Sequence, residues 1–301
     1  MSRILVGPST FGSLNAAPLD RLREAGFEVV RNLFGRTLSE AELRELLPGV
    51  TGLIAGLEPL RGAVLEQSNL RVISRCGAGV SNVDVEAARR LGIAVRSTPD
   101  APTSAVAEVS LAAMLVLLRQ MVPMNAALHQ GQWTRLPGAQ LEGRTVAVVG
   151  FGRIGQRVAR LLLSFGANVI AVDPHVERAE APIELASLAD ALPRADIVAM
   201  HASGDAAILG PNELRRMKRG ALVLNGSRGG LIDEAALCEA LESGHVAGAW
   251  IDVFSEEPYH GPLTQYPQVL LTPHIGSLTA ECRSRMEMEA VDNLLEAYGR
   301  R

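Results

Sequence analysis

Arg228, Glu257 and His274 have the side-chain types used in proton and anion chemistry, and each comes shortly after an apolar run with the length of a strand. If these runs are parallel strands of one sheet, their carboxyl ends meet at the edge where such sheets bind ligands. A single histidine is more often structural, so this interpretation depends on the three residues occurring together. We therefore predict that they form one catalytic centre.

Each of the three has a task in the transfer of hydride to a carbonyl group. Arg228 stands between glycines in NGSRGG, where packing explains it poorly, and its planar guanidinium suits a bidentate carboxylate. Glu257 beside His274 would raise the imidazole pKa and fix its tautomer, which keeps a proton available near neutral pH. Reduction of a 2-keto acid needs such a cation, such an acid and such a carboxylate. The set therefore favours an oxidoreductase acting on small 2-hydroxy or 2-keto acids.

A glycine motif, GFGRIG at 150–155, follows the apolar run 145–149 and opens a helical pattern. Gly150 would make the tight turn, Gly152 would admit a pyrophosphate, and Gly155 would let helix and strand pack closely at a helix N-terminus. Asp173 ends the next apolar run, where its carboxylate would bind the adenosine ribose and repel a 2′-phosphate. The motif in this context predicts NAD rather than NADP. The inner face of the helix is predicted to be Val158, Leu161, Leu162 and Phe165.

Strand-like runs alternate with helical patterns along the first hundred residues, which is typical of a doubly wound parallel sheet. The predicted strands are 4–6, 28–31, 52–55, 72–75 and 94–96, and the predicted helices are 19–25, 40–47 and 85–91. Thr37 and Glu40 have the spacing of a capping box at the start of the second helix. These elements predict a small first domain.

The alternation then stops at a long helical stretch, 105–130, in which Pro123 should cause a kink or a restart. It resumes with predicted strands at 145–149, 169–172, 197–200, 221–224, 249–253 and 269–272, a second sheet of about six strands. A last helix is expected at 279–298, with Met286, Ala290, Leu294 and Ala297 on its apolar face. The predicted fold class is α/β, with two doubly wound parallel-sheet (flavodoxin/Rossmann-like) domains and a cleft between them. The predicted substrate-binding domain is discontinuous, 1–98 plus 276–301, and residues 99–275 are predicted to form the NAD-binding domain.

Composition narrows the class of protein. The chain has 301 residues, ordinary apolar content and a net charge of −4 with both signs interspersed, so neither a nucleic-acid footprint nor a polybasic membrane anchor is expected. The N-terminal residues run directly into a strand-like segment, so no signal peptide is expected, and the longest apolar stretch, 106–118, is too short to span a bilayer. We expect a cytoplasmic protein with neither membrane nor nucleic-acid partners.

Cys76, Cys238 and Cys282 lie far apart, without the spacing of a disulfide framework or a zinc site, so no metal is expected. Cys76 lies in a glycine-rich loop and could be a reactive thiol. The alternative, a small buried hydrophobic residue, is the commoner role of a free cysteine.

The sequence resembles the D-isomer-specific 2-hydroxyacid dehydrogenases, in particular their phosphoglycerate dehydrogenase-like branch. The resemblance runs over about residues 70–280 and rests on several motifs in order: RCGAGVSNVD, AVAE, GFGRIG, NGSRGGLIDEAAL, IDVFSEEP and TPHIGS. It implies two hinged domains, NAD as cofactor, a small-molecule acid as substrate and a homodimer.

The resemblance also implies residue roles. Arg228, Glu257 and His274 match the family's catalytic residues, with His274 as acid and base. The cofactor contacts implied, besides the glycines and Asp173, are Arg153, Ile154, Ala202, Gly226, Ser227 and Asp252, with Asp252 holding the carboxamide. The substrate contacts implied are Arg75 and the backbone N–H groups of Gly77, Ala78 and Gly79.

The substrate stays open at this point. Many phosphoglycerate enzymes carry an arginine for the phosphate at the end of the third strand, where this chain has Gly56. A 3-phosphoglycerate dehydrogenase, a glyoxylate or hydroxypyruvate reductase, and a non-catalytic NAD(H)-sensing protein are the alternatives. Turnover of 2-keto acids would separate the enzymes from the sensor.

Overall fold

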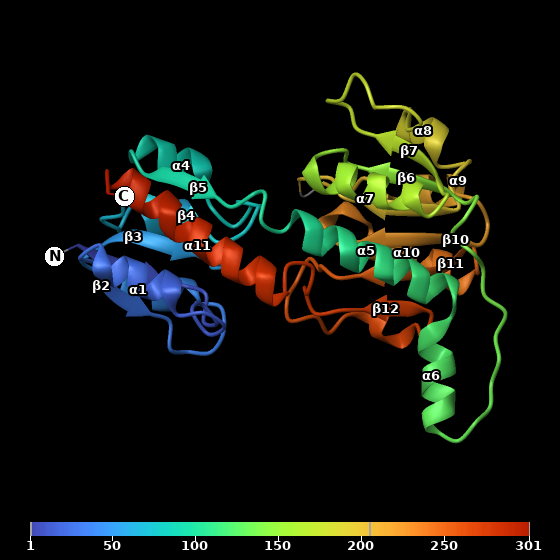
Figure 1. Ribbon diagram of the computed structural model, residues 1–301, viewed down its shortest axis with the longest axis horizontal. Helices are drawn as coiled ribbons and strands as arrows, with labels where there is room; N and C mark the ends of the chain where they lie inside the picture. Colours follow the sequence, from blue (N-terminus) through green and yellow to red (C-terminus); the bar gives the residue numbers. More distant parts are fainter. Residues whose placement is uncertain (1, 205, 301) are drawn as a thin grey trace. The chain divides into compact units, whose positions relative to one another are not determined.

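The computed structural model describes residues 2–204 and 206–300 and contains two compact α/β units (Figure 1). Residues up to Pro102, together with those from Ser277 onward, form the first unit, and Thr103–Gly276 form the second. All paired strands are parallel, in one sheet of five strands and another of seven. The chain therefore has the predicted class of two doubly wound parallel-sheet domains.

The first unit has the strand order β2-β1-β3-β4-β5. Its strands are β1 (Arg3–Val6), β2 (Glu28–Arg31), β3 (Val50–Ala55), β4 (Val72–Arg75) and β5 (Ala94–Ser97). Its helices are α1 (Ala17–Glu24), α2 (Glu40–Leu46), α3 (Gly62–Leu65), α4 (Val85–Arg90) and α11 (Ala280–Ala297). One apolar core lies under α2, α3 and α4, and another lies under α1 and α11. The sheet is therefore covered on both faces, and the last helix of the chain completes the unit.

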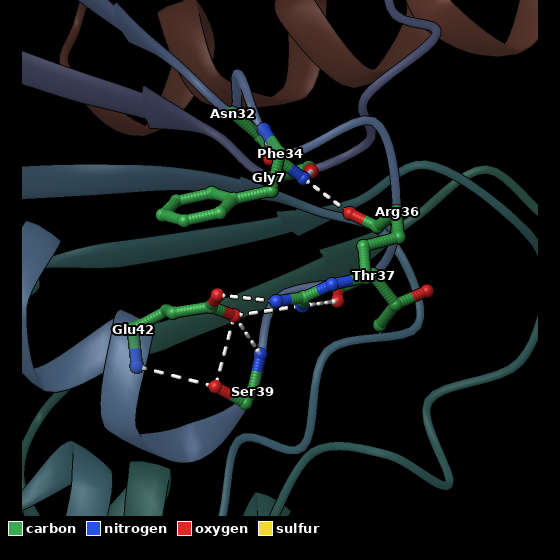
Figure 2. A network of polar contacts seen from close by, with 7 residues as sticks. All are labelled: Gly7, Asn32, Phe34, Arg36, Thr37, Ser39 and Glu42. Atoms are coloured by element: carbon green, nitrogen blue, oxygen red, sulfur yellow. Dashed lines mark hydrogen bonds and ion pairs between the residues drawn. The ribbon is translucent and has the colours of Figure 1, made fainter.

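The start of α2 differs from the prediction (Figure 2). The capping box is formed by Ser39 and Glu42, not by Thr37 and Glu40: the Glu42 backbone N–H donates to Ser39 Oγ at 3.4 Å, and the Ser39 N–H donates to the Glu42 carboxylate at 2.8 Å. Arg36 donates two further hydrogen bonds to the same carboxylate, at 2.6 and 2.9 Å. Both spacings fit a capping box in the sequence, and Arg36 stabilises the one that forms.

The second unit has the strand order β12-β11-β10-β9-β6-β7-β8. Its strands are β6 (Thr145–Val149), β7 (Asn168–Val172), β8 (Glu184–Leu185), β9 (Ile197–Met200), β10 (Ala221–Asn225), β11 (Val246–Ile251) and β12 (Val269–Leu271). Its helices are α5 (Thr103–Leu118), α6 (Met121–His129), α7 (Arg153–Ser164), α8 (Leu188–Ala191), α9 (Pro211–Arg216) and α10 (Glu234–Glu242). The chain reverses its direction of travel across the sheet between β6 and β9, and ligands of open parallel sheets bind at such a reversal.

The long helical stretch breaks earlier than predicted. α5 ends at Leu118, Gln120 adopts a left-handed φ of 48°, and Pro123 lies in the first turn of α6 instead of causing the break. A first-turn proline costs little, because the backbone N–H it lacks would have no partner inside the helix. Of the described residues, no single helix is long and apolar enough to cross a membrane. The bent pair α5–α6 passes that test by length and composition only, as core helices of soluble proteins also do.

The structure corrects two predicted core positions. Phe165 is 44% exposed and follows the end of α7, and Ala297 is exposed at the end of α11, so each helix face is shorter than its sequence period suggested. The two-residue strand β8 was not predicted.

Cys76 is buried, and burial raises the pKa of its thiol to about 12, so its environment is that of a buried hydrophobic residue.

Candidate active site

The glycine motif forms the turn between β6 and α7. Gly150 has a φ of 92°, and a Cβ there would lie 2.3 Å from the Ala202 nitrogen, so a side chain has no room. A Cβ on Gly155 would lie 2.1 Å from the Gly150 carbonyl oxygen, which shows how closely the helix packs on the turn. A Cβ on Gly152, the N-cap of α7, would meet nothing within 4 Å. The turn therefore leaves open space beside a helix N-terminus, which suits a pyrophosphate.

Asp173 follows β7 and is held against this turn. One carboxylate oxygen accepts the Phe151 N–H at 2.8 Å, and the other accepts the His175 N–H at 2.9 Å. Each oxygen keeps lone pairs for further donors, because an ionised carboxylate offers about four acceptor sites. The side chain is thus fixed next to the glycine turn with capacity left for ribose hydroxyl groups.

His274 and Glu257 are in direct contact. His274 Nδ1 lies 3.1 and 2.9 Å from the two carboxylate oxygens of Glu257. Glu257 also accepts the Phe254 N–H at 3.1 Å. Burial opposes ionisation of Glu257, but the hydrogen bond and charge of His274, the Phe254 N–H and the charge of Arg228 together lower its pKa below the usual value. The predicted pair therefore exists. The ionised carboxylate of Glu257 contacts Nδ1 of His274, and Nε2 of the same ring is available to a ligand.

The backbone of His274 has a left-handed φ of 55°, which is uncommon for a non-glycine residue. Asp252, which is 1% exposed, holds this turn: its backbone oxygen accepts the His274 N–H at 2.9 Å, and its carboxylate accepts the Ile275 and Gly276 N–H groups at 2.8 and 2.9 Å. Thr272 adds a hydroxyl donor to Asp252 at 2.6 Å. Asp252 therefore fixes the loop that carries His274, a positioning role beyond the predicted contact with the carboxamide.

Arg228 lies in the loop after β10, half-buried and close enough to Glu257 to stabilise its negative charge. Asn225 shapes this loop by donating to the Arg228 carbonyl at 2.8 Å and accepting the Ser227 N–H at 3.2 Å. A Cβ on Gly229 would lie 2.0 Å from the carbonyl carbon of Phe254, so the loop packs directly on the segment that carries Glu257. The structure thus brings the three predicted catalytic residues to the carboxyl edge of one sheet.

The other predicted cofactor residues also lie at this edge. Arg153 and Ile154 begin α7, Ala202 lies against Gly150, and Gly226 and Ser227 follow β10. Their contacts with a cofactor stay predictions. Sequence reasoning did not single out Asn225 and Thr272, although both are polar residues at strand ends, which was the available signal.

The predicted substrate residues belong to the first unit. Gly77 has a φ of 145°, and its N–H donates to Thr98 Oγ1 at 2.8 Å, so it is already paired. In the described part of the chain no acceptor pairs with the N–H groups of Ala78 and Gly79. Arg75 donates a hydrogen bond to the Cys76 carbonyl and lies over Gly77. Of the three backbone N–H groups predicted to bind the substrate carboxylate, those of Ala78 and Gly79 are therefore the two available to it.

The residues present fit a dinucleotide. The open space at Gly152, the helix N-terminus behind it and the fixed carboxylate of Asp173 match the needs of pyrophosphate and ribose. Within residues 2–204 and 206–300, no group of three or more potential metal ligands is found. The fold and the site together define a Rossmann-type dinucleotide-binding protein with an imidazole–carboxylate pair at the carboxyl edge of its sheet.

Known proteins share this architecture. Residues 111–276 match the model of the NAD-binding domain of D-isomer specific 2-hydroxyacid dehydrogenases. The chain is 41% identical over 234 residues to the D-3-phosphoglycerate dehydrogenase of Mycobacterium bovis, covering 75% of this chain and 44% of that protein. It is 34% identical over 273 residues to the hydroxypyruvate reductase of Thermotoga maritima, covering 87% and 89%. A solved structure from Thermus thermophilus matches with a TM-score of 0.90 and 39% identity, over 99% of this chain and 97% of that one.

The chain belongs to the D-isomer specific 2-hydroxyacid dehydrogenase family, and residues 111–276 are its NAD-binding domain. It spans less than half the length of the mycobacterial relative. The resemblance inferred from the sequence motifs is therefore confirmed.

Proposed function

We propose that this chain interconverts a small D-2-hydroxy acid and its 2-keto acid with NAD(H) as the hydride carrier. The observation that carries the proposal is the contact of His274 with Glu257, at 2.9 Å, in an NAD-binding domain that also places Arg228 beside them. An imidazole held by a carboxylate, next to a guanidinium, is suited to act on a carbonyl oxygen.

Each residue of the site has a separate role in this reaction. Arg228 binds the substrate carboxylate and polarises the neighbouring carbonyl. Glu257 holds His274 Nδ1 so that Nε2 can donate a proton to the carbonyl oxygen during reduction, or accept the hydroxyl proton during oxidation. Gly152 and Asp173 bind the pyrophosphate and ribose of NAD, whose nicotinamide ring supplies or accepts the hydride at substrate carbon 2.

A panel of 2-keto acids tests this function by the loss of NADH absorbance. Glyoxylate, hydroxypyruvate, 3-phosphohydroxypyruvate and pyruvate form the panel, each with NADH and with NADPH. The proposal expects turnover of at least one acid and a preference for NADH. Tight NADH binding without turnover of any acid would contradict it and favour the NAD(H)-sensing alternative.

The first unit favours a substrate without a phosphate. Glu58 is buried at the carboxyl end of the sheet, accepts the Gly56 N–H at 2.5 Å, and interacts electrostatically with Arg75. Burial raises the pKa of Glu58, whereas the Gly56 N–H and the charge of Arg75 oppose that rise. A bound phosphate needs net positive charge, and the ionised form of Glu58 offsets the charge of Arg75. We therefore propose a hydroxypyruvate- or glyoxylate-type substrate. In the panel, kcat/KM for hydroxypyruvate should exceed that for the phosphorylated acid by about tenfold or more, and the reverse order would contradict this proposal.

We also propose that two copies of the chain associate through α6. None of the residues of α6 is buried, although Met121, Val122 and Leu128 are large and apolar, and Trp133 beyond the helix is 81% exposed. A hollow lined mainly by apolar residues lies at the base of α6 in the same unit. A protrusion and a hollow on one chain can pair reciprocally about a two-fold axis.

Light scattering tests the association. The wild-type chain should have the mass of a dimer, and L128E with W133E should have the mass of a monomer. F34E, which alters an exposed apolar residue in the first unit, is the control and should stay dimeric. A monomeric wild type, or a dimeric double variant, would contradict the proposal.

A further inference from the structure

His201 has an unusual environment that the proposed mechanism does not use. Part of the residue is exposed, but both ring nitrogens are out of contact with solvent and have no hydrogen-bond partner in the described structure. Burial lowers the pKa of His201 to about 4, so the ring is neutral at physiological pH. A neutral imidazole has one donor and one acceptor nitrogen, and here neither is satisfied.

The position of His201 in the fold is the second observation. It directly follows β9, and its backbone N–H donates to Val149, the last residue of β6, at 2.7 Å. A Cβ on Gly150 would lie 2.5 Å from the His201 carbonyl carbon. His201 thus lies at the reversal between β6 and β9, the place in this fold where a ligand binds.

The half of the sheet in which His201 lies indicates which part of the cofactor it would contact. In a Rossmann domain, one mononucleotide-binding half holds each nucleotide of the cofactor. Asp173 follows β7 and marks the adenosine half, whereas β9 begins the other half. A phosphate oxygen could satisfy only the donor of a neutral imidazole. A group that both accepts and donates, such as a ribose hydroxyl or a carboxamide, could satisfy both nitrogens.

We propose that His201 is a cofactor-binding residue whose neutral imidazole hydrogen-bonds the nicotinamide nucleoside half of NAD, through its ribose hydroxyls or its carboxamide. The inference rests on the assignment of this domain to NAD and not on the catalytic roles of Arg228 and His274. Unpaired buried polar atoms are costly in a folded chain. A ligand that supplies the missing hydrogen-bond partners would offset this cost at the carboxyl edge of the sheet.

The variant H201L tests the proposal by two readouts that do not depend on turnover. Leucine removes both unpaired nitrogens, so the chain without cofactor should unfold at the same temperature as wild type or higher. Isothermal titration should show NADH binding about tenfold weaker. Binding of AMP, which contains only the adenosine half, should be unchanged.

Three further measurements sharpen the test. H201Q retains a donor and an acceptor and should bind NADH within about threefold of wild type. H245L is the matched control, because His245 also has an unpaired ring nitrogen, Nε2, but lies before β11 at the opposite edge of the sheet. It should leave NADH binding unchanged. ADP-ribose, which lacks the nicotinamide, separates the two ligand groups: H201L weakens its binding if the ribose is the partner, and leaves it unchanged if the carboxamide is.

The proposal is overturned if H201L binds NADH as tightly as wild type, or if it weakens AMP and NADH equally. It is also overturned if H201L lowers the unfolding temperature of the cofactor-free chain while H201Q does not, because the imidazole would then have a structural role. Failure of the proposed enzymatic function would leave these binding results intact, so the two can be told apart.

Discussion

Two carboxylates in this molecule take part in similar ion pairs, but their partners differ. Glu42 lies at the start of α2 and accepts hydrogen bonds from Arg36, whereas Glu257 lies after β11 and contacts His274. Both have a lowered pKa: the hydrogen bond from Arg36 lowers that of Glu42 to about 2, and His274 with Arg228 lowers that of Glu257 against the effect of burial. A lowered carboxyl pKa therefore identifies an ion pair but does not identify its function.

The partner decides what each pair can do. Arginine stays protonated in proteins, so the Arg36–Glu42 pair can only hold structure. An imidazole exchanges a proton near neutral pH, so the Glu257–His274 pair can also move one. The backbones differ in the same way: the N-cap Ser39 has ordinary extended geometry, while His274 has a left-handed φ that Asp252 maintains. The left-handed backbone is thus found at the pair for which we propose a chemical role.

The largest effect should come from His274 itself. H274N removes the proton donor, but asparagine tolerates the left-handed backbone. It should lower kcat about 10²–10⁴-fold, since this is the usual contribution of general acid–base catalysis. Steady-state kinetics measures kcat, and titration with NADH should show unchanged affinity. An undiminished kcat would mean that His274 does not transfer a proton, and the two ion pairs would then not differ in function.

Arg228 should have the next largest effect. R228K keeps the charge but loses the planar two-pronged donor, and should lower kcat/KM about 10–100-fold. R219K, at an exposed arginine of the same unit, is the matched control and should have wild-type kinetics. Equal kinetics for R228K and wild type would exclude a bidentate contact.

Replacing Glu257 should give a smaller, pH-dependent effect. E257Q should lower kcat/KM about tenfold near pH 7, because the imidazole loses its anionic partner. The pKa of Glu257 is lowered by folding, so its contribution is present above about pH 4.5 and is lost as pH falls below that value. The ratio of wild-type to E257Q activity should therefore fall as the pH drops below about 4.5, where Glu257 becomes protonated. E256Q, at the neighbouring exposed carboxylate, should behave as wild type, and a ratio that rises in acid would contradict the assignment.

The smallest effect should come from the structural pair. E42Q should lower the melting temperature by about 2 °C without changing kcat, because it removes part of the capping box. The folded pKa of Glu42 is about 2, so the stabilisation is present above about pH 4.5 and shrinks as pH falls toward 2. Calorimetry of E42Q at pH 7 and pH 3.5 measures this difference. E184Q, at an exposed ion pair that caps no helix, should give a smaller shift, and a change in kcat for E42Q would refute a purely structural role.

Much of the fold could be predicted from alternating apolar runs. The bounds of β2, β4, β6 and β9 are those expected from the sequence, because buried parallel strands are short continuous apolar segments. β11 begins three residues before the predicted start, since Gly248 and the exposed Ala247 weaken the pattern there. The helix break at Gln120 and the cap at Ser39 were mispredicted because each depends on a backbone state or a partner that the local sequence does not reveal.

The site was predictable only in part, for a similar reason. The contact of Glu257 with His274 follows from two strand ends that meet at one edge. The carboxylate of Asp252, by contrast, is committed to backbone N–H groups and a hydroxyl, which a sequence motif cannot show. The unpaired nitrogens of His201 are likewise a property of packing.

A crystal structure of the chain with NAD and a bound 2-hydroxy or 2-keto acid analogue is the most direct measurement of the central claim. One substrate oxygen should lie within about 3.2 Å of His274 Nε2. The Arg228 guanidinium should contact the same ligand, with the nicotinamide ring next to substrate carbon 2. An analogue bound with either side chain facing elsewhere, or a dinucleotide absent from the glycine turn at 150–155, would contradict the account.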